Sequence, residues 1–265
     1  MKKIVAIFFT TTLIALFSLV SCEDNNEITN EKITLEVAAS YVQFTAAGVG
    51  NITFDWGDET ESETFVLSSI NSYYSHQYYS DNKHTLTING HITSFYSSSF
   101  YLDGNYATNQ ITTLDASKNS ALKTLDCSEN IITQIDVNQC TALTELECGN
   151  NWLATLNVND NTALVKLRCQ QNLLTHLDLS NNIKLSILSC NENKITQLDM
   201  NHNIKLKELY CEKNYFSYTE LNKLFETLHA DTINVKGKFI VVSGNPGSRF
   251  CTKEIAEKKG WTVYK

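Results

Sequence analysis

The chain has 265 residues, a formal net charge of −8 and 42% apolar residues. That length allows one large domain or two modest ones, and the apolar share is enough for a packed core, which argues against global disorder. The acidic balance argues against a nucleic-acid partner, because such a partner calls for a basic surface. A single proline excludes collagen-like and proline-rich linker classes.

The N-terminus predicts an export signal. Two lysines precede an apolar run over residues 4–20, which is the layout of a secretory signal peptide. A run of this length could also span a membrane as a helix. However, it ends in the tetrapeptide LVSC at residues 19–22, which resembles the bacterial lipobox. The resemblance implies that residues 1–21 are cleaved off and that lipid on Cys22 anchors the mature chain to a membrane.

Residues 22–31 are expected to form an acidic tether. The segment EDNNE at residues 23–27 is polar and acidic. It resembles the stretch that directs lipoproteins of Bacteroidota to the outer face of the outer membrane. The resemblance implies an outer membrane lipoprotein exposed on the cell surface, and a plain solvated tether is the alternative.

Residues 32–91 predict a small β domain. Apolar and polar residues alternate over 33–37, 42–44 and 52–56, with turn-forming residues between them. A further alternating strand at 85–88 is followed by Asn89-Gly90, a favoured tight-turn pair. Short strands at this spacing predict a β-sandwich.

The β domain resembles a polycystic-kidney-disease (PKD) type of sandwich. The resemblance rests on the segments FDWGD at residues 54–58 and HQY at 76–78, and it departs from the common pattern at Glu59, where glycine is usual. It implies a spacer or a binding module. Calcium needs six to eight oxygen ligands, which this segment does not supply, so Asp58 is expected to cap a turn through its side chain.

Residues 92–217 contain a repeat of 21 residues. In five successive units a cysteine follows a leucine by two residues and precedes an asparagine by three. Because one such turn cannot bury its apolar columns alone, stacked turns must share a core. The ladder residues are Cys127, Cys148, Cys169, Cys190 and Cys211, with Asn130, Asn151, Asn172, Asn193 and Asn214.

The repeat L-x-x-L-x-C-x-x-N-x-L-x-x-L-D-V-x-x-N resembles a leucine-rich repeat. The cysteine resembles the cysteine-ladder repeats of some bacterial internalins. The resemblance implies a mainly β fold: an N-terminal β-sandwich, then a leucine-rich-repeat solenoid of about six turns, then an α/β C-terminal cap. In such a stack the asparagine amides are expected to satisfy backbone groups that the bends leave buried and unpaired.

The cysteines predict structure rather than chemistry. Zinc ligands converge on one tetrahedron, whereas these cysteines form a line. Parallel neighbours in register fit poorly with a relaxed disulfide torsion, so we expect small buried thiols. Cys140 lies in a second polar column that otherwise consists of asparagines. We expect it to be buried and to replace an asparagine there. The other members of that column are Asn119, Asn161, Asn182 and Asn203.

Residues 218–265 predict a cap over the last turn. Ser217 and Glu220 form a capping-box pair ahead of helically spaced apolar residues. This stretch resembles the C-terminal cap of Bacteroidota surface repeat proteins. The expected elements are a helix over 221–228, a strand over 239–242, a turn over 244–247, a helix over 252–259 and a strand over 261–264.

The sequence contains no pattern that predicts an active site. The histidines do not cluster with cysteine or carboxylate at metal-ligand spacing, and no serine-nucleophile motif is present. Asp136, Asp178 and Asp199 recur at one repeat position, which favours a solvated or turn-bonding column over a catalytic pair. We therefore expect no enzyme, no metal and no cofactor.

The remaining hypotheses are both binding functions. A surface lipoprotein that binds a protein or mediates adhesion would use the outward residues of the first strand of each repeat, because strand residues alternate in and out. The second half of each repeat also reads as a strand, so the opposite face stays an alternative. A glycan-binding lipoprotein would use the tyrosines at 73, 74, 78 and 79. The predicted protein-binding row is Asp126, Glu147, Arg168, Ser189 and Tyr210, with Arg168 and Tyr210 carrying most of the affinity.

Overall fold

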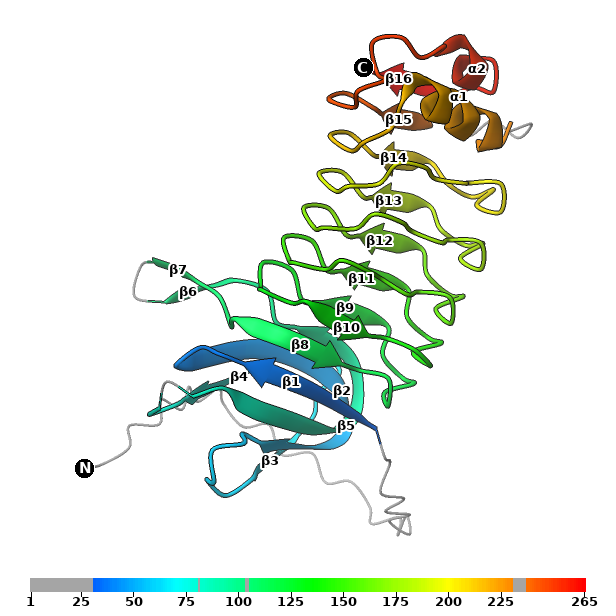
Figure 1. Cartoon of the computed structure of the whole chain (residues 1–265). Coiled ribbons are helices and arrows are strands. Elements are labelled where there is room, and N and C mark those ends of the chain that lie inside the picture. Colours follow the sequence, from blue (N-terminus) through cyan, green and yellow to red (C-terminus); the bar gives the residue numbers. More distant parts are fainter. Residues whose placement is uncertain (1–30, 81, 103–104, 231–236) are drawn as a thin grey trace, which may run out of the picture.

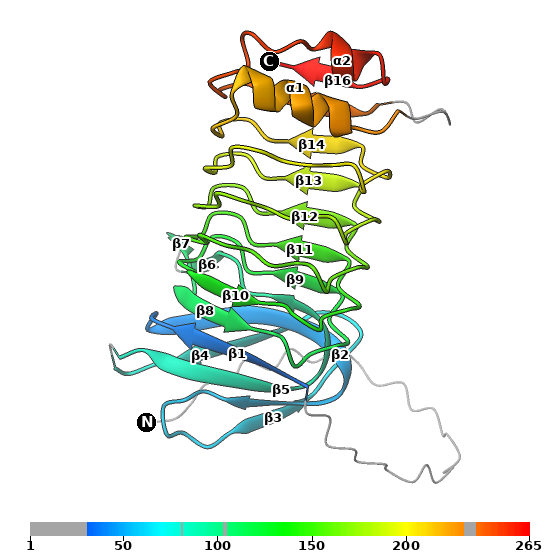
Figure 2. The same ribbon diagram turned by 45° about the vertical axis from the view of Figure 1, so that its right-hand side comes forward.

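The computed structural model describes residues 31–265 except positions 81, 103–104 and 231–236. The predicted signal peptide, Cys22 and the tether up to residue 30 lie outside the described residues. The described chain is elongated: a β unit at one end continues into a stack of short strands, and a small α/β segment covers the far end (Figure 1; Figure 2). Within these residues, neither helix is long and apolar enough to cross a membrane.

Strands dominate the described part of the chain. Hydrogen bonds join all of them except β6 and β7 into one sheet, along the path β10-β8-β1-β5-β9-β11-β12-β13-β14-β15-β16, with β2, β3 and β4 branching from β5. The elements are β1 (Lys32–Val37), β2 (Tyr41–Asp55), β3 (Glu63–Val66), β4 (Ser72–Gln77), β5 (His84–Tyr96), β6 (Phe100–Leu102), β7 (Asn105–Ala107), β8 (Ile111–Asp115), β9 (Thr124–Asp126), β10 (Gln134–Asp136), β11 (Glu145–Glu147), β12 (Lys166–Arg168), β13 (Ile187–Ser189), β14 (Glu208–Tyr210), α1 (Tyr218–Thr227), β15 (Phe239–Val241), α2 (Glu254–Glu257) and β16 (Thr262–Tyr264).

The N-terminal unit, β1–β5, is packed around aromatic rings. β2 pairs antiparallel with β3, β4 and β5, and β1 pairs antiparallel with β5. The ring centroids of Phe54 and Trp56 lie 5.1 Å apart, and those of Trp56 and His76 lie 4.4 Å apart, both stacked. The β-sandwich stays a prediction, because hydrogen bonds join these strands to one another and to the solenoid in a single sheet.

Strand β5 joins the N-terminal unit to the solenoid. Its first half pairs antiparallel with β1, and its last residues pair parallel with β9. The predicted turn at Asn89-Gly90 is wrong, because this pair lies inside β5. Gly90 has a φ of 151°, and a Cβ there would lie 2.8 Å from the Asn51 carbonyl oxygen, so glycine lets β2 approach. A domain boundary at residue 91 would therefore cut a strand.

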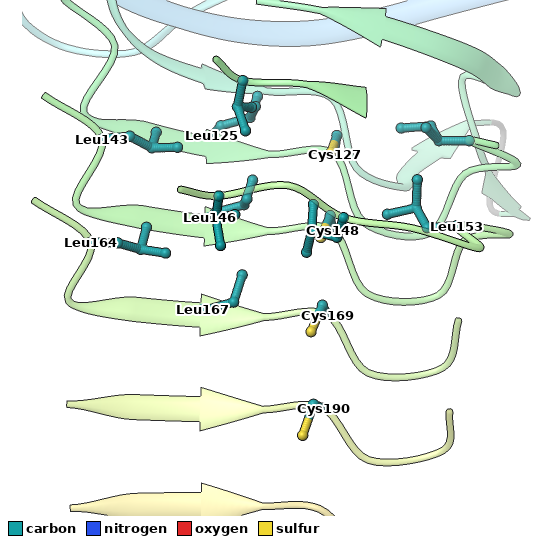
Figure 3. Packing of buried hydrophobic residues seen from close by; sticks show 14 of the residues in the cluster. Leu125, Cys127, Leu143, Leu146, Cys148, Leu153, Leu164, Leu167, Cys169 and Cys190 are labelled. Atoms are coloured by element: carbon teal, nitrogen blue, oxygen red, sulfur yellow. The ribbon is translucent and has the colours of Figure 1, made fainter. Parts of the chain in front are cut away.

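Beyond β5 the repeats form a parallel stack. β9, β11, β12, β13 and β14 pair in register at the 21-residue interval, so that the leucine at the centre of each strand lies beside that of the preceding turn. These leucines and the cysteines that follow them are fully buried, in continuous columns (Figure 3). The prediction of a mainly β chain with a leucine-rich-repeat solenoid is confirmed.

The second half of each repeat forms a strand only near the N-terminal unit. There β8 and β10 pair in parallel. In the later described turns the corresponding segments form no strand. The stack therefore offers one continuous sheet face, on the side of β9 and β11–β16.

A buried asparagine ties each turn to the turn before it. In the central turn, Asn172 Nδ2 donates to the carbonyl oxygen of Cys148 in the preceding turn, at 3.0 Å, and to that of Cys169 in its own turn, at 3.2 Å. Its Oδ1 accepts from the backbone N–H of Leu153 in the preceding turn, at 2.9 Å. The amide thus satisfies both a buried donor and buried acceptors. The same bonds are made by Asn130, Asn151, Asn193 and Asn214.

The ladder runs past the five clear repeats at both ends. Asn109 donates to the carbonyl oxygen of Ser97 at 2.9 Å and accepts from the N–H of Gln43 at 2.7 Å, which bonds the first rung to β2. Asn245, in the predicted cap turn, donates to the carbonyl oxygen of Cys211 at 2.9 Å. The described ladder therefore has seven rungs, or about seven turns rather than about six. A search for a 21-residue period does not find Asn245, because α1 is inserted before it. Asn245 therefore lies 31 residues after the preceding rung, Asn214.

From Asn161 onward, the amides of the second polar column act only as donors, whereas the buried Asn119 amide has no hydrogen-bond partner among the described residues. Asn161 Nδ2 donates to the carbonyl oxygen of Val137 in the preceding turn, at 2.9 Å, whereas its Oδ1 has no partner among the described residues. A thiol can replace an amide that acts only as a donor, and Cys140 Sγ donates to the carbonyl oxygen of Ala116 at 3.1 Å. Asn182 and Asn203 continue the column in the same way.

The recurring acidic column closes turns. Asp136 Oδ1 accepts from the backbone N–H of Asn138, two residues on, at 2.9 Å. Asp178 and Asp199 accept in the same way from the residues two positions after them, at 3.0 and 2.8 Å. A carboxylate engaged in its own turn is an Asx turn, and the interpretation of this column as turn-bonding is confirmed.

Helix α1 covers the last turns. Ser217 Oγ accepts from the N–H of Glu220 at 3.2 Å, while the Glu220 carboxylate pairs with Lys223, so only one half of the predicted capping box forms among the described residues. The helix buries Leu221 and Phe225. β15 and β16 extend the parallel sheet beyond β14, and α2 is shorter than the predicted helix over 252–259.

Removing one rung should destabilise the stack. Asn172→Ala leaves a buried N–H and buried carbonyl groups without their partner, which should cost about 1–3 kcal/mol. The matched control is Asn181→Ala. The side chain of this exposed asparagine makes a single 3.3 Å hydrogen bond within the described part of the chain, to the carbonyl oxygen of Asn159, so its loss should change stability by no more than about 0.5 kcal/mol. Chemical denaturation measures both changes, and equal losses would contradict the ladder's role.

Candidate functional site

The five predicted binding residues form one row across the sheet. The leucine at each strand centre is buried, so the residues on either side of it point outward. Residues paired in register share a face of the sheet. The successive pairings of β9, β11, β12, β13 and β14 place side by side Asp126, Glu147, Arg168, Ser189 and Tyr210.

The row is longer than the repeat pattern indicates. Tyr96 of β5 pairs with Asp126 at one end. Val241 and Tyr264 continue beyond Tyr210 at the other. Sequence reasoning missed these residues because none of them follows the 21-residue period: the pairing partners Tyr96 and Asp126 are 30 residues apart, and β15 and β16 also depart from the period. The outward row from Tyr96 to Tyr264, with its neighbours on the same strands, is called the strand face below.

The centre of the strand face is a charged cluster. Glu147 pairs with Arg168 at 2.7 Å and with Lys166 at 2.5 Å, and Lys166 also lies 3.6 Å from Glu145. Partial burial opposes the ionisation of Glu147, but the hydrogen bonds and charges of Lys166 and Arg168 outweigh it and lower the pKa of Glu147. At neutral pH this cluster therefore carries charges of both signs.

Asp126 has the opposite electrostatic setting. Burial raises the pKa of its carboxyl, and the negative charge of Glu147 adds to the rise. Hydrogen bonds from the backbone N–H and hydroxyl of Ser128, at 3.0 and 2.6 Å, oppose the rise without cancelling it. The acidic end of the row is therefore harder to ionise than its centre.

Ser189 is buried, which corrects its assignment as an outward contact residue. Its short side chain lies between Arg168 and Tyr210, which are its register partners on the two adjacent strands. The positive charge of Arg168 reaches the Tyr210 hydroxyl across it, where it opposes the rise in the pKa of Tyr210 that burial and Glu208 cause. Arg168 and Tyr210 are thus neighbours on the surface even though a strand separates them.

The C-terminal end of the strand face is aromatic. The rings of Tyr210 and Phe239 meet edge to face with centroids 5.2 Å apart, and those of Phe239 and Tyr264 lie 5.9 Å apart. The aromatic residues of β15 and β16 were visible in the sequence, but nothing in the repeat pattern placed them beside Tyr210. The edge-to-face geometry stabilises such a cluster and leaves ring faces for a ligand.

Two of the four tyrosines proposed for a glycan site are buried and cannot contact a ligand. Tyr74 and Tyr78 lie in the core of the N-terminal unit, and the Tyr78 hydroxyl donates to the carbonyl oxygen of Trp56 at 3.0 Å. Tyr73 and Tyr79 are 77% and 97% exposed. Strand alternation explains the split at residues 73 and 74, because successive side chains of β4 point to opposite faces.

The acidic segment at residues 54–58 forms a turn and a contact with a histidine. Asp58 Oδ1 accepts from the Thr60 hydroxyl at 2.6 Å, and Oδ2 lies 2.7 Å from His76 Nε2. Some burial opposes ionisation, but the hydrogen bonds of Thr60 and His76 lower the pKa of Asp58 to about 2. The Asp58 carboxylate therefore bonds within its own turn, as the sequence predicts, and also contacts a histidine.

The cysteine ladder consists of protonated thiols. The seven cysteines from Cys127 to Cys251 are free and buried. Burial raises the pKa of Cys148 and Cys190 to about 12, and only the thiolate acts as nucleophile or metal ligand. Among the described residues, no group of three histidine, cysteine or acidic side chains could hold a metal ion. Cys251 donates to the carbonyl oxygen of Ser248 at 3.2 Å, within the cap.

Comparison with known proteins finds similar chains among solved structures, two of which are described here. No protein-family model matches the sequence, and no curated protein matches it. The chain is similar to the functional domain of InlJ from Listeria monocytogenes, which includes a cysteine ladder, with 36% identity and a TM-score of 0.46 over 56% of this chain and 30% of that one. It is also similar to a leucine-rich-repeat protein of Leptospira interrogans, with 20% identity and a TM-score of 0.43 over 56% of this chain and 44% of that one. The match spans less than half the length of either structure.

Two strand-face carboxyls should affect stability with opposite pH dependence. The lowered pKa of Glu147 contributes stability above its unfolded pKa, and this is lost as the pH falls through the folded value. Glu147→Gln should therefore destabilise the protein most at pH 7, and less as the pH falls toward 3. The raised pKa of Asp126 favours the protonated form, so its contribution is present at low pH and is lost as the pH rises through the folded value.

Asp126→Asn should therefore become more stabilising, relative to the parent chain, as the pH rises from 3 to 7. The measurement is the free energy of unfolding of both variants and the parent at several pH values. Parallel pH profiles for the two variants would show that the charges of the strand face are not arranged as described.

Proposed function

We propose that the protein is a lipid-anchored, cell-surface leucine-rich-repeat protein that binds another protein through the strand face and mediates adhesion, without catalysis. The observation that supports this proposal is the row of outward residues held in register by the stack, with a charged centre and an aromatic end. A leucine-rich-repeat solenoid is consistent with a protein-binding scaffold, and its rigid sheet presents such a row without a further ordering cost.

Arg168 and Tyr210 are the proposed anchors. Within the described residues the Arg168 guanidinium donates only through Nη1, to Glu147, and 37% of the side chain is exposed. Its other N–H groups can therefore reach a carboxylate or carbonyl group of a partner. Tyr210 offers a ring and a hydroxyl beside it, and arginine and tyrosine are enriched among interface hot spots.

The dimensions of the strand face limit the partner. With strands about 4.8 Å apart and about 3.3 Å per residue, the row from Tyr96 to Tyr264 is about 34 Å long and about 10 Å wide. That area is about 340 Å², smaller than the roughly 800 Å² that each side of a stable protein interface buries. A partner must therefore also contact residues beside the strand face.

The proposed location follows from the N-terminal sequence. Lipid on Cys22 would anchor the chain to the outer membrane, and residues 23–31 would link the anchor to β1. The solenoid would then extend away from the anchored end. Exposure to the outside is proposed from the acidic tether alone.

Loss of both anchors should abolish partner binding. Arg168→Ala with Tyr210→Ala removes the exposed cation and ring from the strand face, so affinity should fall at least tenfold, or about 1.4 kcal/mol or more. The purified chain is used to capture proteins from the cell's surroundings, and the captured proteins are quantified. The dissociation constant of each captured protein is then measured by calorimetry.

The matched control is Lys194→Ala with Tyr215→Ala. It also removes one cation and one tyrosine, both exposed, from the edge of the stack that follows the asparagine ladder. Denaturation midpoints of the two double variants confirm that both are folded. Equal binding by the strand-face variant and the control would move the site away from the strand face.

Cys22→Ala should release the protein from the membrane fraction. Without the thiol no lipid can be attached, so the mature chain has no acyl anchor. Cell fractionation and intact-mass measurement follow the change, with Asn25→Ala as the control in the adjacent tether. A Cys22→Ala chain that stays in the membrane with its signal cleaved and its mass otherwise unchanged would refute lipid anchoring.

A further inference from the structure

A groove lies where the N-terminal unit meets the solenoid. It is lined by residues of β2, β4, β5 and the start of β6, and its volume is about 510 Å³, within the range of small-molecule sites. The β6–β7 hairpin stands out from the body of the molecule beside these strands (Figure 1). The groove continues the strand face, because Tyr96 belongs to both.

Two tyrosines flank a threonine in this groove. Thr45 of β2 pairs with Tyr73 of β4 on one side and with Tyr96 of β5 on the other. In-register partners share a face, so the two tyrosines project to the same side with their backbones about 10 Å apart. Phe100 of β6 adds a third ring, which is packed against Tyr41 with centroids 5.8 Å apart.

The polar groups of the groove carry no charge. Its lining combines the amide of Gln43 with the hydroxyls of Thr45 and Ser99 and those of the two tyrosines, and none of the described lining residues is acidic or basic. The Gln43 backbone is fixed by the first ladder rung, since it donates to and accepts from the Asn109 amide at 2.7 and 2.9 Å. The groove is therefore preformed.

This combination selects a class of ligand. A sugar ring presents C–H groups on its faces and hydroxyls at its edge, which complement aromatic faces and neutral hydrogen-bonding groups. An ionic ligand finds no opposite charge in the lining, and an anionic one would lie beside Asp126, the register neighbour of Tyr96. We propose that the groove binds a neutral saccharide unit of a glycan.

The saccharide site shares Tyr96 with the strand face but none of the five residues of the predicted protein-binding row. It contains neither Arg168 nor Tyr210, and it does not depend on the proposed function. It also differs from a site built on the clustered tyrosines of β4, because the second ring comes from β5 and the third from β6. Binding here would bring a glycan against the strand face, within reach of a glycosylated partner.

The test is a glycan array of neutral and acidic oligosaccharides probed with the purified full chain, followed by calorimetry on the neutral oligosaccharides retained. At least one neutral oligosaccharide should bind, and its acidic counterparts should bind more weakly. Tyr73→Ala and Tyr96→Ala should each weaken binding at least tenfold, while Tyr73→Trp should retain it. The control is Tyr79→Ala, because Tyr79 is exposed but does not line the groove.

Each other outcome overturns the saccharide site. These outcomes are no binding of any neutral oligosaccharide, binding that survives Tyr73→Ala and Tyr96→Ala, and equal loss with Tyr79→Ala. If Tyr73→Ala instead abolishes recovery of a protein partner while no oligosaccharide binds, the groove belongs to the protein interface. The Arg168→Ala, Tyr210→Ala variant should bind oligosaccharide as the parent chain does, so failure of either proposal is seen separately.

Discussion

One buried asparagine amide per turn holds the solenoid together. In each rung, Nδ2 donates to a carbonyl oxygen of the preceding turn and Oδ1 accepts an N–H from that turn, so two turns are fixed relative to each other at one corner. The residue before six of the seven rungs adopts a left-handed conformation: it is Gly244 before Asn245, and in the five clear repeats it is a residue other than glycine, with φ between 52° and 56°. The stack holds this unfavourable backbone in place because the rung and the buried leucine column together outweigh its cost.

The same constraint builds the proposed binding surface. Because rungs repeat at one corner, the strands beside them lie in register, and residues 21 positions apart become neighbours on the strand face. The ladder also reaches both flanking units, through Asn109 to β2 and through Asn245 to the cap. The aromatic groove and the aromatic end of the strand face are therefore positioned by the same bonds as the charged centre. What looks like three modules in the sequence is one continuous sheet.

Periodicity made the solenoid and its outward row predictable, because every turn repeats one set of contacts. Features that break the period were not predictable in the same way. Asn245 lies behind an inserted helix, and Ser97 takes the place of a ladder cysteine at the end of β5, where its carbonyl oxygen accepts from Asn130. Composition alone could not distinguish buried Tyr74 from exposed Tyr73, and the burial of Ser189 depends on the length of its neighbours rather than on strand alternation. Cys140 does follow the period, but it stands where the other turns have asparagine. A thiol can replace the amide there because the position requires only a hydrogen-bond donor, and the sequence alone does not show which positions require only a donor.

The central claim is that the asparagine amides are bonded into the backbone of adjacent turns in solution. Native-state hydrogen exchange measures this directly at the amides of Ile132, Leu153, Leu174 and Ile195, each of which donates to a rung Oδ1 at 2.9 Å. These four amides should exchange as slowly as those of the buried strands and open only with the stack. The reference is the amide of Asn159, which also donates to an asparagine Oδ1 but in an exposed turn, and which should exchange quickly. Exchange of the four rung amides at the rate of Asn159 would contradict the account.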